Sequence, residues 1–286
     1  MKVFHVAVFT PSSTNVWQAD AFDELGCDTY RYDYRKRAVD LGDTNARDDE
    51  LIELCKAESP DIILFSKCNK MDVRVVKECS KIGITALWYM DPRGNIDAEL
   101  ILKMRASNYI FTSRWDGIRE GKRHNNNVYY VHEGYDPKTN YPMNVHKIRD
   151  VSFIGNLRGD RFRYHEAIKF DVINNAYREE HARIVSETKI NLNLTEGDGT
   201  SDRTYKILAA GGFLLTLPWE KMEESFVDGL DFVVFYNVLD LKEKINYYLR
   251  HENERNVIAA TGCETVKRYD NKNYARTILE AINGHK

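Results

Sequence analysis

The chain has 286 residues, of which 43% are hydrophobic and 30% charged, with a formal net charge of −3 at neutral pH. This length suits two domains, no apolar run approaches the ~20 residues of a membrane helix, and the balance of charge gives no general reason to expect nucleic acid. The five cysteines are scattered, odd in number and without a Cys-x-x-Cys pair. A disulfide framework and a structural zinc site are therefore not expected, and a reducing, cytoplasmic location is predicted.

The first half of the chain alternates apolar strands with amphipathic helices. Most of its predicted strands are nearly unbroken apolar runs, which is typical of a parallel sheet with helices on both faces. The predicted strands are residues 2–9, 27–34, 61–66, 84–90, 108–113 and 127–133, and the predicted helices 15–26, 46–60 and 71–83.

A segment with two prolines and no periodicity follows, and residues 136–149 are predicted to be a linker. The alternation then restarts. Strands are predicted at 150–156, 189–194, 212–217 and 231–237, with helices over most of 161–188, over 202–210 and over most of the rest. The sequence therefore predicts an α/β protein of two Rossmann-like doubly wound domains, residues 1–135 and 150–286, with a ligand cleft between them.

The segment "SDRTYKILAAGGFLLT" (201–216) joins a charged helix start to a glycine pair and a strand. Arg203 stands in the first helical turn, where the helix dipole favours an acid, so its charge is not explained by helix stability. An arginine at a helix start is well suited to binding a phosphate or diphosphate. The structural alternative is a solvated arginine at 203, followed by a glycine cap at Gly211 and Gly212.

A second basic strand end is "SFIGNLRGDR" (152–161), in which Gly155 and Asn156 are followed by Arg158 and Arg161. A glycine after a first strand often leaves room for a ligand, and the arginines could bind an anion there. A tight turn with a basic helix start explains any single arginine at least as well. Asn193, at the end of "KINLNL" (189–194), is a further candidate. The acidic loop after it contains Glu196 and Asp198, which could contact sugar hydroxyls or form a surface connection.

In the first domain, Asp91 follows the predicted strand at 84–90 directly. A carboxylate there could act as a general base, although Asp before Pro also commonly begins a turn. No Ser/His/Asp triad and no cluster with metal-ligand spacing occurs, so no metal is expected.

Taken together, these motifs resemble the CgeB/YkvP-like glycosyltransferases, named for spore-maturation proteins. The segment 201–216 resembles the family's R-x-[FY]-E-x-x-A-x-G-G-[FP]-L-L-T, "VSFIGNLRGDR" resembles its F-[IV]-G-[NS] strand end, and "WYMDP" resembles its W-x-x-D turn. The resemblance implies a GT-B architecture in which the second domain binds a nucleotide-diphosphate sugar, with a UDP-sugar as the expected donor. It implies that Arg203 contacts the diphosphate, that Gly155 and Asn156 approach the donor, and that Gly211 and Gly212 close the motif helix.

One residue departs from the family motif: its glutamate is Lys206 here. A lysine cannot accept hydrogen bonds from a ribose but could add a phosphate contact. The leading hypothesis is a metal-independent glycosyltransferase with Asp91 as base and an undetermined acceptor: a glycan, a small molecule, a protein or a modified DNA base. The alternatives are a catalytically inactive GT-B-like binding or assembly protein and a phage-type DNA nucleobase glycosyltransferase.

Overall fold

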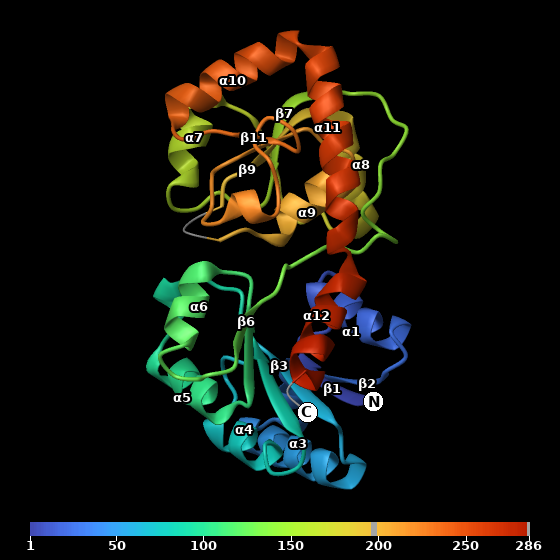
Figure 1. Cartoon of the computed structure of the whole chain (residues 1–286), viewed down its shortest axis with the longest axis vertical. Helices are drawn as coiled ribbons and strands as arrows, with labels where there is room; N and C mark the ends of the chain where they lie inside the picture. Colours follow the sequence, from blue (N-terminus) through green and yellow to red (C-terminus); the bar gives the residue numbers. More distant parts are fainter. Residues whose placement is uncertain (196–198, 285–286) are drawn as a thin grey trace. The chain divides into compact units, whose positions relative to one another are not determined.

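The computed structural model describes residues 1–195 and 199–284, and the chain forms two compact units (Figure 1). Unit 1 is Met1–His132 together with the C-terminal residues from Asn271, and unit 2 is Glu133–Asp270. Each unit is built on its own parallel sheet.

The sheet of unit 1 has six parallel strands in the order β2-β1-β3-β4-β5-β6. The strands are β1 (Lys2–Ala7), β2 (Asp28–Asp33), β3 (Ile62–Ser66), β4 (Ile84–Trp88), β5 (Tyr109–Thr112) and β6 (Val128–Tyr130). The helices are α1 (Thr14–Glu24), α2 (Tyr34–Leu41), α3 (Thr44–Glu58), α4 (Val73–Cys79), α5 (Ala98–Ala106), α6 (Trp115–Gly121) and α12 (Asn271–Asn283).

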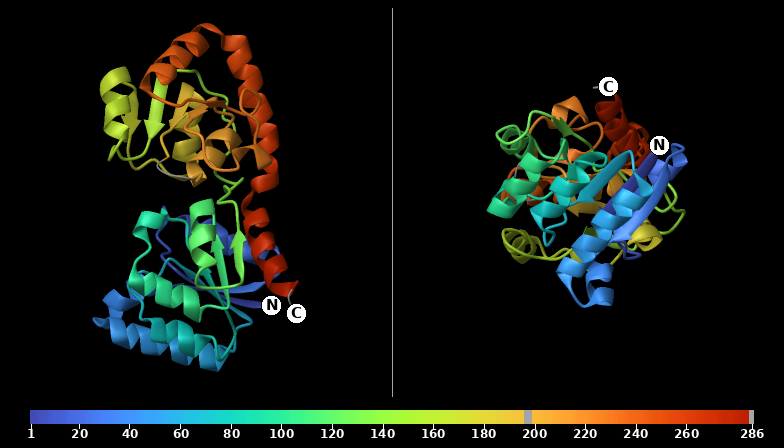
Figure 2. Two further views of the ribbon diagram at one scale, coloured as in Figure 1. Left: turned by 60° about the vertical axis from the view of Figure 1, so that its left-hand side comes forward. Right: turned by 90° about the horizontal axis from the view of Figure 1, so that it is seen from below.

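Both faces of this sheet are apolar because its strands lie between two helix layers. Ile63 and Phe65 of β3 pack in a core with residues of α3, α4 and α5, whereas Ile62 and Leu64 pack in a second core with residues of α1 and α12. This alternation explains why β3 reads as a continuous apolar run in the sequence. Helix α12 lies beside α1 in both views of Figure 2, although the two are far apart in the chain.

The sheet of unit 2 has five parallel strands in the order β11-β10-β9-β7-β8. The strands are β7 (Arg149–Ile154), β8 (Asp171–Ile173), β9 (Thr188–Asn193), β10 (Leu214–Thr216) and β11 (Val233–Val234). The helices are α7 (Arg161–Ile168), α8 (Arg178–Glu187), α9 (Asp202–Ala209), α10 (Val238–Arg250) and α11 (Glu252–Val266).

Both sheets place a topological switch point at an equivalent position. Successive connections run to opposite sides of the first strand, so the switch point falls between β1 and β3 in unit 1 and between β7 and β9 in unit 2. In open α/β sheets, ligands bind beyond the carboxyl ends of the strands at such a point. The predicted fold class is therefore confirmed, and it directs attention to residues 155–161, 194–195 and 199–203.

Several elements differ from the sequence prediction. Residues 161–188 are mostly helical, as predicted, but the short edge strand β8 separates α7 from α8. Helix α2 was not predicted, and β11 spans two residues instead of seven. Residues 136–149 belong to unit 2, where Asp136, Thr139 and Asn140 are buried, and the last helix belongs to unit 1. In the described part of the chain, no helix has both the length and the apolar character needed to cross a membrane.

Candidate functional site

Arg203 lies at the switch point of unit 2, fixed by the ends of two strands. Its Nε donates to the carbonyl oxygen of Ile154 on β7 at 2.8 Å, and its Nη1 donates to Oδ1 of Asn193 on β9 at 2.9 Å. The Asn193 carboxamide is buried and is itself oriented, because its Nδ2 donates to Oγ1 of Thr204 at 2.9 Å. Asn193 therefore holds the arginine in place rather than facing a ligand.

Gly155 leaves the space that the arginine occupies. Its φ is +146°, in a region that favours glycine. A Cβ at this position would lie 2.8 Å from Nη2 of Arg203 and 3.2 Å from the ring of Phe153. The residue after β7 is thus glycine because a side chain would push the guanidinium out of position.

A second arginine shares the same aromatic ring. The guanidinium of Arg203 lies over Phe153 at 4.9 Å from the ring centroid, and that of Arg161 lies over it at 5.5 Å. Arg161 is anchored to both strand ends, since its Nε donates to the carbonyl oxygen of Leu194 and its Nη1 to that of Asn156. Two of the three predicted arginines, Arg161 and Arg203, are therefore brought together at the carboxyl ends of β7 and β9.

Several charged side chains act on Arg203 at this edge. Burial lowers the pKa of Arg203 to about 10; the charges of Arg161 and Arg158 act in the same direction, while Asp202 and Glu133 act against them. At neutral pH the guanidinium nevertheless remains charged. Arg158 is exposed, and no hydrogen bond or ion pair ties its side chain to another described residue. A phosphate here would relieve the repulsion among the three cations.

Lys206 does not present an unpaired charge to this site. Its Nζ lies 2.5 Å from Oδ2 of Asp202, one helical turn earlier on α9. Burial opposes ionisation of Asp202, but the ammonium of Lys206 outweighs it and holds the pKa of Asp202 below its usual value. Lys206 thus acts first as the partner of Asp202.

The amino end of α9 carries a carboxylate from the start of unit 2. The backbone N–H of Asp202 donates to Oε2 of Glu133 at 3.0 Å. The helix dipole stabilises a carboxylate at a helix amino terminus, so the charge of Glu133 is favoured at this position. Glu133 was not predicted as a donor-site residue, because 69 residues separate it from the N–H that donates to it.

Gly211 and Gly212 lie at the other end of α9, about 12 Å along the helix axis from Arg203. Gly211 has φ +70° and ends the helix. A Cβ on Gly212 would lie 2.5 Å from Cγ1 of Val185 and 2.9 Å from Nδ2 of Asn191. These glycines let the chain turn from α9 into β10, and the structure does not bring them to the arginines.

In unit 1, Asp91 lies just beyond β4 and is paired. Nζ of Lys67, which follows β3, is 2.7 Å from Oδ1 of Asp91, and the two side chains are 38% and 27% exposed. Asp91 is thus an accessible carboxylate at the carboxyl edge of the sheet, paired with Lys67, which was not a predicted site residue. Glu196 and Asp198 lie outside the described residues. Across residues 1–195 and 199–284, no group of three or more His, Cys, Asp or Glu side chains is placed to hold a metal ion.

Comparison with known proteins agrees with this architecture. Residues 142–280 match the model of a family described as glycosyl transferase-like. The fold is similar to that of Alr3699/HepE from Anabaena in complex with UDP-glucose, with 8% identity, a TM-score of 0.74, and coverage of 99% of this chain and 100% of that one. No curated protein matches the sequence.

Two further solved structures share the fold. The lipopolysaccharide outer core galactosyltransferase WaaB aligns over all of both chains with 11% identity and a TM-score of 0.68. An alpha-glucosyltransferase in complex with UDP-glucose and DNA containing an abasic site aligns over 99% of this chain and 98% of that one, with 11% identity and a TM-score of 0.70. Residues 142–280 thus resemble a glycosyl transferase-like family, and the chain has the two-domain fold of the GT-B glycosyltransferases.

Proposed function

We propose that the protein transfers a glycosyl group from a nucleotide-diphosphate sugar, with a UDP-sugar as donor, to a hydroxyl group of an acceptor. The observation that carries this proposal is the pair Arg203 and Arg161. Both guanidiniums lie over one phenylalanine ring at the switch point of unit 2, where two neighbouring cations are suited to binding a diphosphate. The glycosyl transferase-like family match over this domain supports the same reading.

In the proposed reaction the acceptor oxygen attacks the anomeric carbon of the sugar while the bond from that carbon to the diphosphate breaks. The diphosphate leaves with the bonding electrons, and the arginines stabilise its charge without a metal ion. We propose Asp91 as the base that takes the proton of the acceptor hydroxyl, because it is an accessible carboxylate at the ligand-binding edge of unit 1. Arg158 and the Asn156 strand end would complete the donor site.

The choice of UDP rests on the neighbours that share the fold, several of which are described in complex with UDP or UDP-glucose. Within the glycosyl transferase-like family we place the chain with the CgeB/YkvP-like proteins, on the segment 201–216. A cytoplasmic site of action is proposed, consistent with five free cysteines.

The competing proposal is that the protein has the GT-B fold and acts in binding or assembly without catalysing glycosyl transfer. It is favoured by Lys206, which stands in place of the family glutamate and is engaged by Asp202. DNA as the acceptor is a third outcome, because one similar structure was solved with DNA.

One experiment separates these outcomes. The full chain is titrated with UDP, UDP-glucose, ADP-glucose and GDP-mannose by calorimetry, and release of the nucleoside diphosphate is then followed with glycans or DNA added. Binding followed by acceptor-dependent release supports the transferase. Binding without release on long incubation indicates the inactive binding protein. If no nucleotide binds, the proposed donor site is wrong.

A further inference from the structure

Glu133 brings a carboxylate to the edge of unit 2 at which the arginines of the proposed donor site lie. Its Oε2 accepts the backbone N–H of Asp202 at 3.0 Å, at the amino end of α9. The side chain of Ser201, the N-cap residue of α9, makes no capping hydrogen bond, so this N–H is served by an acid 69 residues away. Backbone N–H groups at a helix amino end are groups that a phosphate would otherwise bind.

The charge of Glu133 also reaches Arg203. Burial lowers the pKa of Arg203 to about 10, and Glu133 is one of two acids that act against this effect by favouring the charged guanidinium. Nε and Nη1 of the guanidinium are bonded to Ile154 and Asn193, whereas its Nη2 hydrogen-bonds to no other described residue. A carboxylate that stabilises this guanidinium also repels an anion that approaches Nη2.

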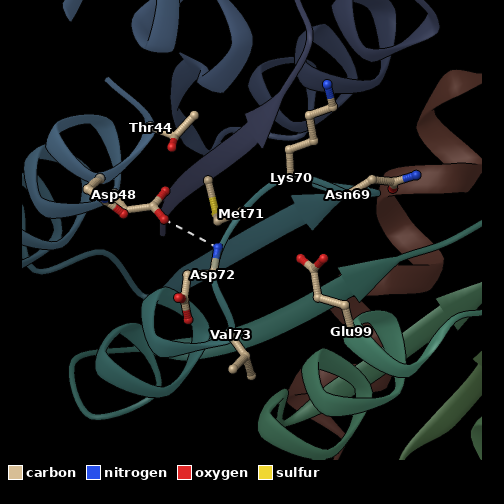
Figure 3. A pocket seen from close by; sticks show the side chains of 9 residues that line it. Thr44, Asp48, Asn69, Lys70, Met71, Asp72, Val73 and Glu99 are labelled. Atoms are coloured by element: carbon tan, nitrogen blue, oxygen red, sulfur yellow. Dashed lines mark hydrogen bonds between the residues drawn. The ribbon is translucent and has the colours of Figure 1, made fainter. Parts of the chain in front are cut away.

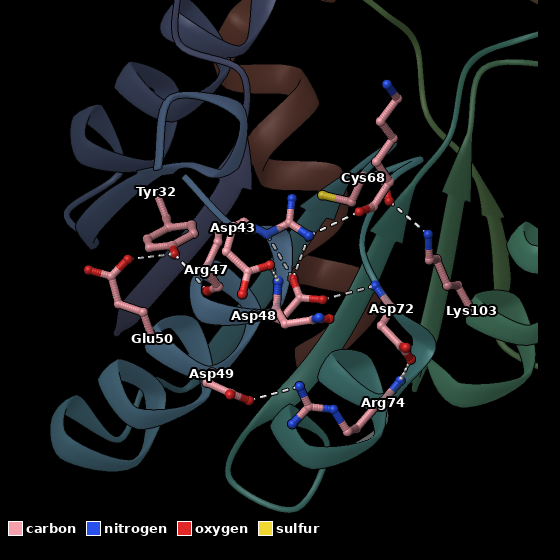
Figure 4. A network of polar contacts seen from close by, with 12 residues as sticks. Tyr32, Asp43, Arg47, Asp48, Asp49, Glu50, Cys68, Asp72, Arg74 and Lys103 are labelled. Carbon is pink, nitrogen blue, oxygen red and sulfur yellow. Dashed lines mark hydrogen bonds and ion pairs between the residues drawn. The ribbon is translucent and has the colours of Figure 1, made fainter. Parts of the chain in front are cut away.

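Unit 1 contains a comparable contact that the fold explains. Oδ2 of Asp48 accepts the backbone N–H of Asp72 at 3.2 Å, at the start of α4 (Figure 3). Oδ1 of Asp48 accepts from Nε of Arg47 at 2.7 Å, and Nη2 of Arg47 holds the carbonyl oxygen of Lys70 at 2.9 Å (Figure 4). Asp48 and Arg47 are both buried, so this acid serves the packing of α3 against α4. Glu133, in contrast, is half-buried at an edge where ligands bind.

We propose that Glu133 competes with the diphosphate of the donor: its carboxylate occupies the amino end of α9 and lowers the affinity of the arginines for phosphate groups. This inference rests on the proposed donor site, and it names a residue that limits how tightly that site binds. A bound diphosphate displaces the carboxylate from the N–H of Asp202, and the carboxylate returns when the diphosphate leaves. Glu133 therefore favours release of the nucleoside diphosphate after transfer.

The test uses the full chain and calorimetric titration with UDP and with inorganic diphosphate, which carries the charge without any sugar hydroxyl. Glu133→Gln removes the negative charge but keeps an oxygen that can accept the N–H of Asp202, whereas Glu133→Ala removes both. Glu252→Gln, at an exposed position in the first turn of α11, is the matched control. Thermal unfolding is recorded for each variant.

Both Glu133 variants are expected to bind UDP and inorganic diphosphate about tenfold more tightly than the wild-type chain, because one repulsive charge is removed. The gain should shrink as the salt concentration rises, since salt screens that charge. Glu252→Gln should bind both ligands with wild-type affinity. A purely structural role of Glu133 would instead lower thermal stability without tightening the binding of either ligand.

The inference alone is overturned if the wild-type chain binds UDP and the Glu133 variants bind it with equal or lower affinity. Lower affinity for UDP would mean that Glu133 accepts hydrogen bonds from the nucleotide instead of competing with its phosphates. If neither the wild-type chain nor the Glu133 variants bind UDP or inorganic diphosphate, the proposed donor site is wrong, and this inference falls with it.

Discussion

Nη1 of Arg203 lies 2.9 Å from Oδ1 of Asn193, so a buried carboxamide at the end of β9 sets the direction of the arginine at the proposed donor site. The carboxamide is also held on its other side, because its Nδ2 donates a hydrogen bond to Oγ1 of Thr204. The position of the Arg203 guanidinium is therefore set by the end of β9, although the residue itself belongs to α9.

Asn193→Ala should weaken nucleotide binding about tenfold and lower the free energy of unfolding by about 1–3 kcal/mol, because Arg203 and Thr204 each lose a buried partner. Calorimetry with UDP and denaturant unfolding measure the two effects, and Asn253→Ala serves as the exposed control. Unchanged UDP affinity in a destabilised variant would show that the arginine does not need this anchor.

Gly155→Ala should act on the same arginine from the other strand. The added Cβ would lie 2.8 Å from Nη2 of Arg203, and the backbone would be strained at φ +146°. We expect UDP affinity to fall and stability to drop by about 1–3 kcal/mol. Gly94→Ala is the control, since a Cβ there meets nothing within 4 Å. Equal effects of Gly155→Ala and Gly94→Ala on UDP affinity would show that Gly155 does not keep Arg203 in its binding position.

Much of this site followed from local patterns in the sequence. Arg203 was predicted because it opens a helix after a strand, and Gly155 because it ends a strand that begins a domain. Their geometry could not be predicted, since the bonds of Arg203 depend on which strands are neighbours. The bond to Ile154 spans 49 residues and requires β7 to lie beside β9.

Asp91→Asn should reduce glycosyl transfer by about 10²–10⁴-fold while leaving UDP affinity unchanged, because the proposed base lies in unit 1 and the arginines in unit 2. The asparagine oxygen can still accept from Lys67, so the fold should be retained. Asp28→Asn, on an exposed carboxylate of β2, is the matched control. A variant with full turnover would exclude Asp91 as the base.

The partner of Asp91 illustrates a limit of sequence reasoning. Lys67 and Asp91 are 24 residues apart and meet only because β3 and β4 are paired in register from Ile62 to Ser66. Similarly, strand β8 escaped prediction because three residues at a sheet edge give too little periodicity to stand out between two helices.

Protonation of buried His181 should destabilise unit 2 in acid. Burial lowers its pKa to about 3, with the charges of Lys206 and Arg203 acting in the same direction and Asp202 against them. The unfolded chain binds this proton near pH 6.5, so the contribution of the neutral imidazole to the free energy of unfolding is fully present above that pH. This contribution falls as the pH drops towards 3, by up to about 1.4 kcal/mol per pH unit.

Denaturant unfolding between pH 7 and 4.5 measures this slope. His181→Gln should flatten it, whereas His146→Gln, at an exposed position, should not. An unchanged slope in His181→Gln would mean that other groups govern the acid sensitivity, His5 among them, whose pKa burial also lowers to about 3.

The most direct test of the central claim is calorimetric titration of UDP into Arg203→Ala and into Arg163→Ala. The two substitutions remove the same charge. Arg163 lies on α7 two residues after Arg161, but its guanidinium lies over the ring of Tyr164 rather than over Phe153. We expect the wild-type chain and Arg163→Ala to bind UDP with similar affinity, and Arg203→Ala to lose measurable binding. Equal UDP affinity of the two variants would show that Arg203 does not hold the donor.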